Sequence, residues 1–238
     1  MFWKYPVSDE MQHWIADGFV WAVEAGLLTV QTPLVLPNKT FFTAPSGRNE
    51  ATVKGLIADI ARIVGVSDAN IEVAQIEKLP PEYRHNYQSL GDTAGTWQGD
   101  TEQSLIRYDA ELFARPVTMI ATLAHEFMHE VLHLHVDGST LPGGAEAEEL
   151  STDLHVITSG FGVIQLAGAE QIGWQGYLSQ PSRAHALALF LRVTESETAV
   201  ALENLPPRSA KYLRRAMKFL KANPGDVQRI QDSFPSPA

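Results

Sequence analysis

The residues best suited to chemistry in this chain are two histidines four positions apart, His125 and His129, with Glu126 directly after the first. On a helix, residues four apart lie on one face, with Cβ atoms about 6 Å apart. Two imidazoles so placed can bind one tetrahedral metal ion. A carboxylate beside the first ligand can reach a water molecule on that ion. The spacing therefore predicts a metal site with a general base beside it.

A third protein ligand is expected because a catalytic tetrahedral ion keeps three protein ligands and one position for water. Glu149 follows His129 by twenty residues, and Asp153 follows Glu149 by four, so the two carboxylates share one face of a predicted helix. Glu149 can coordinate the ion. Asp153 can accept a hydrogen bond from the outer nitrogen of a ligand imidazole, which fixes its tautomer and raises its basicity.

Two other carboxylates compete for these roles. Glu146 lies one helical turn before Glu149 on the same face and is the rival third ligand. Glu148 lies off the face of Asp153 and is a weaker candidate. The sequence leaves the choice open, but the separation from the histidine pair favours Glu149.

Three further histidines lie near the motif and are possible ligands. His133 continues the series, but its Cα lies about 12 Å along a regular helix from that of His125, too far to share one ion unless the helix breaks. We interpret His133 as a structural or rim residue. His135 points to another side of the helix, and His155 is interpreted as a packed histidine.

The pattern His-Glu-x-x-His is a known signature of zinc peptidases. Together with the later Glu149 and Asp153, it resembles the gluzincin clan of metallopeptidases, typified by thermolysin, over about 30 residues. The resemblance implies that His125, His129 and Glu149 bind one Zn²⁺ ion. It also implies that Glu126 is the base and that Asp153 orients a histidine. No clear counterpart of the later histidine motif of thermolysin is found.

A broader likeness covers most of the chain but is less specific. The chain resembles a group of bacterial zincin-like proteins over residues 121–129, 152–162, 176–181 and 186–190. This likeness implies a zincin-like fold and says little about the substrate.

The expected chemistry is hydrolysis of a peptide bond. Zinc lowers the pKa of its bound water toward 7, and Glu126 takes the proton and returns it to the leaving amine. The oxyanion needs a further donor. Tyr177 and His185 are candidates because they follow the active-site helices. A metal-stabilised scaffold without turnover and a zinc hydrolase that is not a peptidase remain alternatives.

The elements that must position these residues follow from apolar spacing, caps and prolines. Strands are expected at Leu34–Leu36, around 71–76 and in a hairpin over 94–109 with its turn near Gly99. Residues 79–93 read as a polar loop. Helices are expected over 9–25, 50–64, 116–134, 145–160 with a possible kinked extension, a segment from 181, a short one before 206, and 208–222.

This order of elements predicts one α+β, zincin-like domain over residues 1–222. Residues 1–110 would supply a small mixed sheet with helices. Residues 111–222 would form the helical part that carries the metal site, and residues 223–238 a C-terminal tail.

Composition limits the partners. The net charge is −10, and an acidic chain argues against nucleic acid as a partner because phosphate binding needs clustered cations. The absence of cysteine excludes disulfides and thiolate ligands. The N-terminus lacks the apolar run of a signal peptide, and the most apolar stretch, 156–169, is too short to span a bilayer. We expect a cytoplasmic protein that acts on a peptide or protein substrate.

Overall fold

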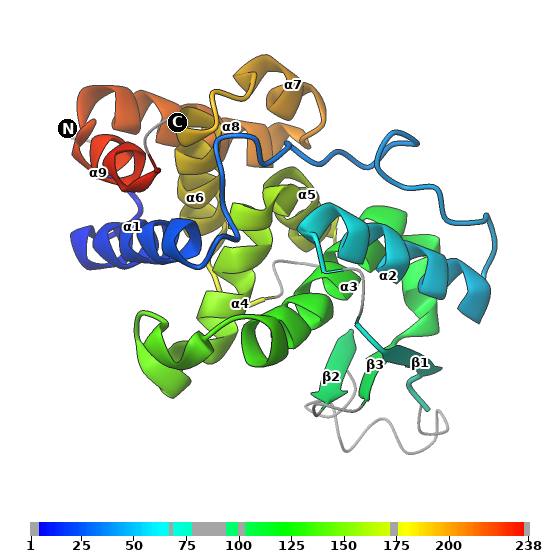
Figure 1. Ribbon diagram of the computed structural model, residues 1–238. Coiled ribbons are helices and arrows are strands. Elements are labelled where there is room, and N and C mark those ends of the chain that lie inside the picture. The colour runs from blue at the N-terminus through cyan, green and yellow to red at the C-terminus, as the bar shows by residue number, and fades with distance from the viewer. Residues whose placement is uncertain (1–4, 67–68, 78–93, 100–102, 172–175, 236–238) are drawn as a thin grey trace, which may run out of the picture.

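The computed structural model describes residues 5–66, 69–77, 94–99, 103–171 and 176–235 (Figure 1). The chain folds as a mostly helical α+β protein with one small mixed sheet, as predicted. The elements are α1 (Asp9–Glu24), α2 (Glu50–Val64), β1 (Ile71–Gln75), β2 (Gly95–Gly99), β3 (Ser104–Tyr108), α3 (Pro116–Glu130), α4 (Glu148–Val156), α5 (Gly162–Gln171), α6 (Gln180–Val193), α7 (Thr198–Glu203), α8 (Pro207–Ala222) and α9 (Gly225–Ser233).

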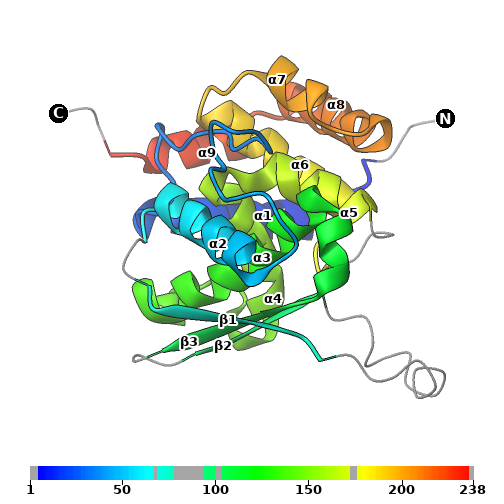
Figure 2. The same cartoon turned by 90° about the vertical axis from the view of Figure 1, so that its right-hand side faces the viewer.

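The sheet has the strand order β1-β3-β2. Strand β1 runs parallel to β3, pairing Val73 with Ile106, and β2 runs antiparallel to β3, pairing Trp97 with the same Ile106. Both views place the sheet at one end of the molecule, with α7 and α8 at the opposite end (Figures 1 and 2). Helix α3 packs against β2 and β3, so the edge strand β2 lies beside the predicted metal-binding helix.

The first two helices begin and end where the sequence predicts. Ser8 caps α1 by accepting a hydrogen bond from the backbone N–H of Met11, and Asn49 caps α2 in the same way from Thr52. Gly65 ends α2 in the left-handed conformation, with φ of 85°.

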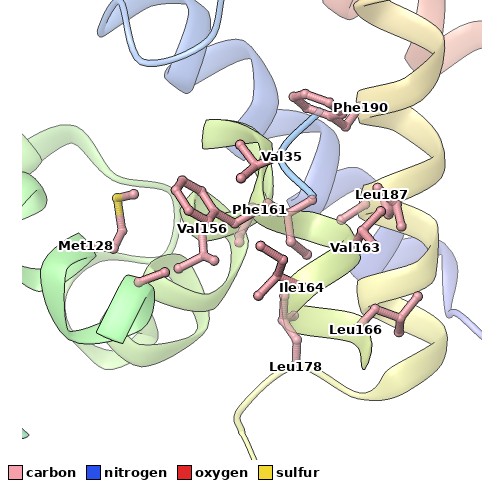
Figure 3. Close-up of a cluster of buried hydrophobic side chains, with 14 of the residues drawn as sticks. Val35, Met128, Val156, Phe161, Val163, Ile164, Leu166, Leu178, Leu187 and Phe190 are labelled. Carbon is pink, nitrogen blue, oxygen red and sulfur yellow. The ribbon is translucent and has the colours of Figure 1, made fainter. Parts of the chain in front are cut away.

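The core is centred on α5 and α6. Figure 3 shows Val163 and Ile164 of α5 and Leu187 of α6 gathered with Phe161 and with Val35 from the N-terminal part of the chain. Helix α6 is buried on almost every side, so its apolar residues do not form a single stripe. Within the described part of the chain, no helix is both long and apolar enough to cross a membrane.

The expected strand Leu34–Leu36 does not form; this prediction was wrong. Pro33 and Pro37 have no N–H to donate to a ladder, and no described strand lies beside this segment. Instead the segment crosses the junction of α4 and α5, where the N–H of Val35 donates to the carbonyl oxygen of Gly160 at 3.0 Å.

Two helices continue through wider, π-helical turns. Helix α3 runs into a π turn over Val131–His135, so the chain stays helical to about the predicted end. Helix α4 leads through Ile157–Phe161 into α5, and Gly160 marks the predicted kink with φ of 96°. Such turns are frequent at functional sites because they re-aim side chains.

The expected tail after residue 222 is in part a helix, and the sequence interpretation was wrong there. Asn223 ends α8, but α9 follows directly and packs against α1 and α6. Val227 and Ile230, three positions apart, are buried, and Arg229 pairs with Asp17 of α1. The two apolar residues are enough to fix a short helix on a neighbour, although too few to reveal it in the sequence. The expected loop at 79–93 lies outside the described residues.

Gly160→Ala is expected to lower the free energy of unfolding by about 3 kcal/mol. Left-handed backbone costs a non-glycine residue about 1–2 kcal/mol. The new Cβ would also overlap the backbone oxygen of Pro33, and such overpacking adds about 1–3 kcal/mol. Gly26→Ala is the control, because Gly26 has φ of 74° but nothing within 4 Å of a Cβ. Urea denaturation would compare them, and equal losses would show that the contact with Pro33 costs nothing.

Candidate metal centre

Helix α3 presents both histidines of the motif on one side. Pro116 stands at the first turn of the helix, where its missing N–H costs nothing. The rings of His125 and His129 lie 5.0 Å apart between centroids, with an angle of 83° between their planes. Both side chains are mostly buried, so their positions are fixed by packing.

Glu149, at the start of α4, faces both rings with one oxygen. Its Oε2 lies 3.2 Å from Nε2 of His125 and 3.4 Å from Nε2 of His129. Ligand atoms held about 2.0–2.2 Å from a tetrahedral ion are separated by about 3.3–3.6 Å. These three residues therefore form a group that could hold a metal ion.

Asp153, one turn further along α4, lies behind the first histidine. Its Oδ1 is 3.0 Å from Nδ1 of His125, so that ring nitrogen donates to the carboxylate, while Nε2 faces Glu149 and can bind an ion once it gives up its proton. Four more groups donate to the same buried carboxylate. They are the backbone N–H groups of Tyr177 (2.8 Å) and Leu178 (2.9 Å), Nε2 of Gln165 (3.0 Å) and the guanidinium of Arg183 (2.8 Å).

The charges around His125 favour a cation. Burial raises the pKa of Asp153, but the hydrogen bond from His125 and the charge of Arg183 outweigh it and hold this pKa at about 2. Burial lowers the pKa of His125, whereas its hydrogen bonds to Asp153 and Glu149 outweigh burial and raise this pKa to about 10. Two ionised carboxylates thus flank one imidazole, which is an environment that attracts a positive ion.

Glu126 lies between α3 and the edge strand β2. Its side chain is 6% exposed, and a Cβ on Gly95 of β2 would lie 2.8 Å from Oε1, so the strand backbone covers the carboxylate closely. Burial raises the pKa of Glu126 to about 7, although the charge of His125 and a hydrogen bond from the backbone N–H of Trp97 act in the opposite direction. A general base works best with a pKa near the working pH.

A pocket of about 800 Å³ opens over this group. Strand β2 forms one side of it and Tyr177 another. Tyr177 is 57% exposed, and its ring stacks on that of His125 with centroids 6.0 Å apart and an angle of 12°. Burial and the nearby charge of Glu149 raise the pKa of its hydroxyl, which therefore stays protonated at neutral pH. Tyr177 is thus at the predicted site.

His185 is not at the site, and the expectation that it serves as an oxyanion donor was wrong. It lies inside α6 with no exposed surface, and its Nδ1 is 2.9 Å from the hydroxyl of Tyr5. Its ring packs against Phe219, and it does not line the pocket. The position of His185 after the motif did not predict which way its side chain faces, because α6 turns Arg183 rather than His185 toward Asp153.

The two rival carboxylates, Glu146 and Glu148, do not belong to the group formed by His125, His129 and Glu149. Glu146 belongs to a 3-10 turn over Gly144–Ala147 and is exposed, because α4 begins only at Glu148. Glu148 turns toward His133, with Oε1 and Nε2 2.8 Å apart.

The remaining histidines also have other partners. His135 contacts Glu130, with 3.4 Å between Nε2 and Oε1. His155 is fully buried, packs on Trp21 and lies 3.2 Å from the hydroxyl of Thr158, so it is a packed histidine as the sequence interpretation holds.

Sequence reasoning missed Arg183 and Gly95. Arg183 is 2% exposed and pairs with Asp153, and a charged residue directly before the mostly apolar stretch 184–191 is the signal that marks it. Gly95 gave no signal, because its role depends on how closely β2 approaches α3.

Comparisons of the chain with protein-family models, with curated proteins and with solved structures found no match. The residues of the site therefore carry the functional argument by themselves.

Proposed function

We propose that this chain is a zinc-dependent peptidase with a zincin-like fold and a gluzincin-like set of ligands. One observation carries the proposal. A single oxygen of Glu149 lies 3.2 and 3.4 Å from the two Nε2 atoms of His125 and His129, the spacing expected around a tetrahedral ion. Two imidazoles and one carboxylate suit zinc among the common metals, and they leave one coordination position toward the pocket.

The surroundings of the ligands favour catalysis over a purely structural role. A structural zinc site is closed by four protein ligands and needs no base. Here Glu126 is buried beside the ligands with a pKa of about 7, and both Glu126 and Tyr177 line the open pocket.

Each residue then has a distinct part in hydrolysis. Zinc, when bound, would supply a water molecule of lowered pKa and polarise the carbonyl of the substrate. Glu126 takes the proton of the attacking water and passes it to the leaving amine. Tyr177 offers its protonated hydroxyl to the developing oxyanion from the pocket rim. Asp153 holds His125 in the tautomer that leaves Nε2 free.

The substrate class follows from the pocket. A volume of about 800 Å³ is in the range of sites that enclose several groups of a ligand. Strand β2 runs along one side of it, and an extended peptide or a protein loop fits beside such a strand. We therefore infer a peptide or protein substrate.

Purified protein is expected to contain one tightly bound zinc ion per chain and to cleave peptides in a mixed library. His129→Ala should lose both the ion and the cleavage, because it removes a ligand. His13→Ala is the matched control, since His13 is an exposed histidine of α1 outside the site. Elemental analysis and mass spectrometry of the library give the two readouts.

Two outcomes would contradict the proposal. Full zinc occupancy in His129→Ala would show that the ion lies elsewhere. Zinc at one ion per chain without chelator-sensitive cleavage of any peptide or protein substrate would instead favour a metal-stabilised scaffold.

A further inference from the structure

A second group of ligand-type side chains lies beside the first. It is formed by His133 in the π turn after α3, Glu148 at the start of α4, and His129. Oε1 of Glu148 is 2.8 Å from Nε2 of His133 and 3.6 Å from Nδ1 of His129. The first separation is shorter than the spacing of about 3.3–3.6 Å expected around a tetrahedral ion and the second lies at its upper end, and the three ligand atoms lie within 4.8 Å of one another.

The ring of His129 separates the two groups. Its Nε2 faces Glu149, at 3.4 Å, and its Nδ1 faces Glu148, at 3.6 Å. A single imidazole therefore offers one nitrogen to each group. In the simpler arrangement no second ion binds, and the hydroxyl of Thr152, 3.5 Å from Nδ1, and the carboxylate of Glu148 would only orient the ring.

The side chains of this second group are supported from behind. The indole of Trp97 stacks on His133, with centroids 5.1 Å apart, and on His129, at 6.1 Å. Its Nε1 donates to the buried carboxylate of Glu130, which also accepts a hydrogen bond from Ser104. The indole is therefore held in place, and it limits the directions in which both imidazoles can turn.

The outer side of the group is open. The side chains of His133 and Glu148 are 41% and 42% exposed, so water molecules can complete the coordination of an ion. Two exposed side chains lose rotamer freedom when they bind, which makes this group weaker than the buried one. Imidazole and carboxylate donors suit zinc, nickel or copper rather than calcium or magnesium.

We propose that His133, Glu148 and Nδ1 of His129 form a second, weaker site for a divalent transition-metal ion. To hold the ion, Nδ1 of His129 would give up its proton to solvent, so that each nitrogen of this ring would serve one of the two groups. The inference depends on the proposed zinc centre only through this shared ring, because His133 and Glu148 belong to the second group alone.

Equilibrium dialysis of the full chain against increasing Zn²⁺ tests the proposal. Wild type is expected to bind a tight ion and then a weaker one, and His133→Gln and Glu148→Gln are each expected to lose only the weaker one. His13→Gln, which removes an exposed histidine of α1, should bind both. Two ions in both His133→Gln and Glu148→Gln, or a single ion in wild type at all zinc concentrations, would overturn the second site.

The location of the weaker ion has its own readout. Ni²⁺ added to the zinc-loaded chain should quench the fluorescence of Trp97, because this indole stacks on His133. The quenching should vanish in Trp97→Phe and in His133→Gln. Quenching that is equal in Trp97→Phe and wild type would place the ion elsewhere. An error in the proposed zinc centre would be seen separately, because Glu149→Ala would then still bind the tight ion.

Discussion

Glu126→Gln is expected to keep the zinc ion and the fold while lowering kcat by about a hundred- to ten-thousand-fold. The amide has the same shape as the carboxylate and can still accept the hydrogen bond from the backbone of Trp97. It cannot take a proton from water at neutral pH. Zinc content, thermal unfolding and cleavage of the best peptide from the library would be measured on the same preparation.

Glu170→Gln is the matched control for this change. Glu170 is a partly buried carboxylate at the end of α5 that accepts hydrogen bonds from Ser209, away from the pocket. Glu170→Gln should therefore change only the free energy of unfolding. A wild-type rate in Glu126→Gln would refute the role of this residue as base. Loss of zinc from the same variant would mean that the carboxylate belongs to the metal-binding set.

Asp153→Ala is expected to lower the free energy of unfolding by about 3–5 kcal/mol, because it removes a buried carboxylate that pairs with a buried charge. That charge is Arg183, which is 2% exposed. The backbone N–H groups of Tyr177 and Leu178 lose their acceptor as well. Zinc affinity should fall by about 10- to 100-fold, the usual cost of removing a partner behind a ligand. Chemical denaturation and competition with a chelator would measure the two losses.

Two comparison variants separate stability from metal binding. Asp59→Ala removes another buried carboxylate, which accepts from the backbone of Thr43 and Ala44, and should cost stability without changing zinc affinity. Glu149→Ala should lower zinc affinity with little change in stability, since the side chain of Glu149 is 41% exposed but faces both histidines. Equal zinc affinities in Glu149→Ala and Asp153→Ala would mean that the two carboxylates have been assigned the wrong way round.

The local part of the site could be predicted because helical geometry determines it. Residues four positions apart on a helix lie on one face, which places His125 beside His129 and Glu149 beside Asp153. The helix caps at Ser8 and Asn49 were equally predictable, because a side chain three residues away satisfies the first free N–H groups.

The rest depends on contacts between distant segments, which local patterns do not encode. His185 and Arg183 lie two positions apart in α6, and only the packing of that helix decides which one faces the candidate site. The segment after Pro33 looks like a strand in the sequence, but none of the strands in the described residues lies beside it. Helix α9 was missed because its stability comes from docking on α1 and α6 rather than from its own sequence.

The hydrogen bonds at Asp153 have a consequence for the order in which the protein matures during synthesis. A nascent chain that ends near residue 171 already carries the whole histidine motif and Glu149. It still lacks three of the groups that donate to Asp153, since Tyr177, Leu178 and Arg183 have not been made. His125 would then contact Asp153 while three of the hydrogen bonds that hold this carboxylate are still missing. The hydrogen bonds that hold Asp153 are thus complete only after α6 has been translated, and under the proposed function the centre would be assembled only then.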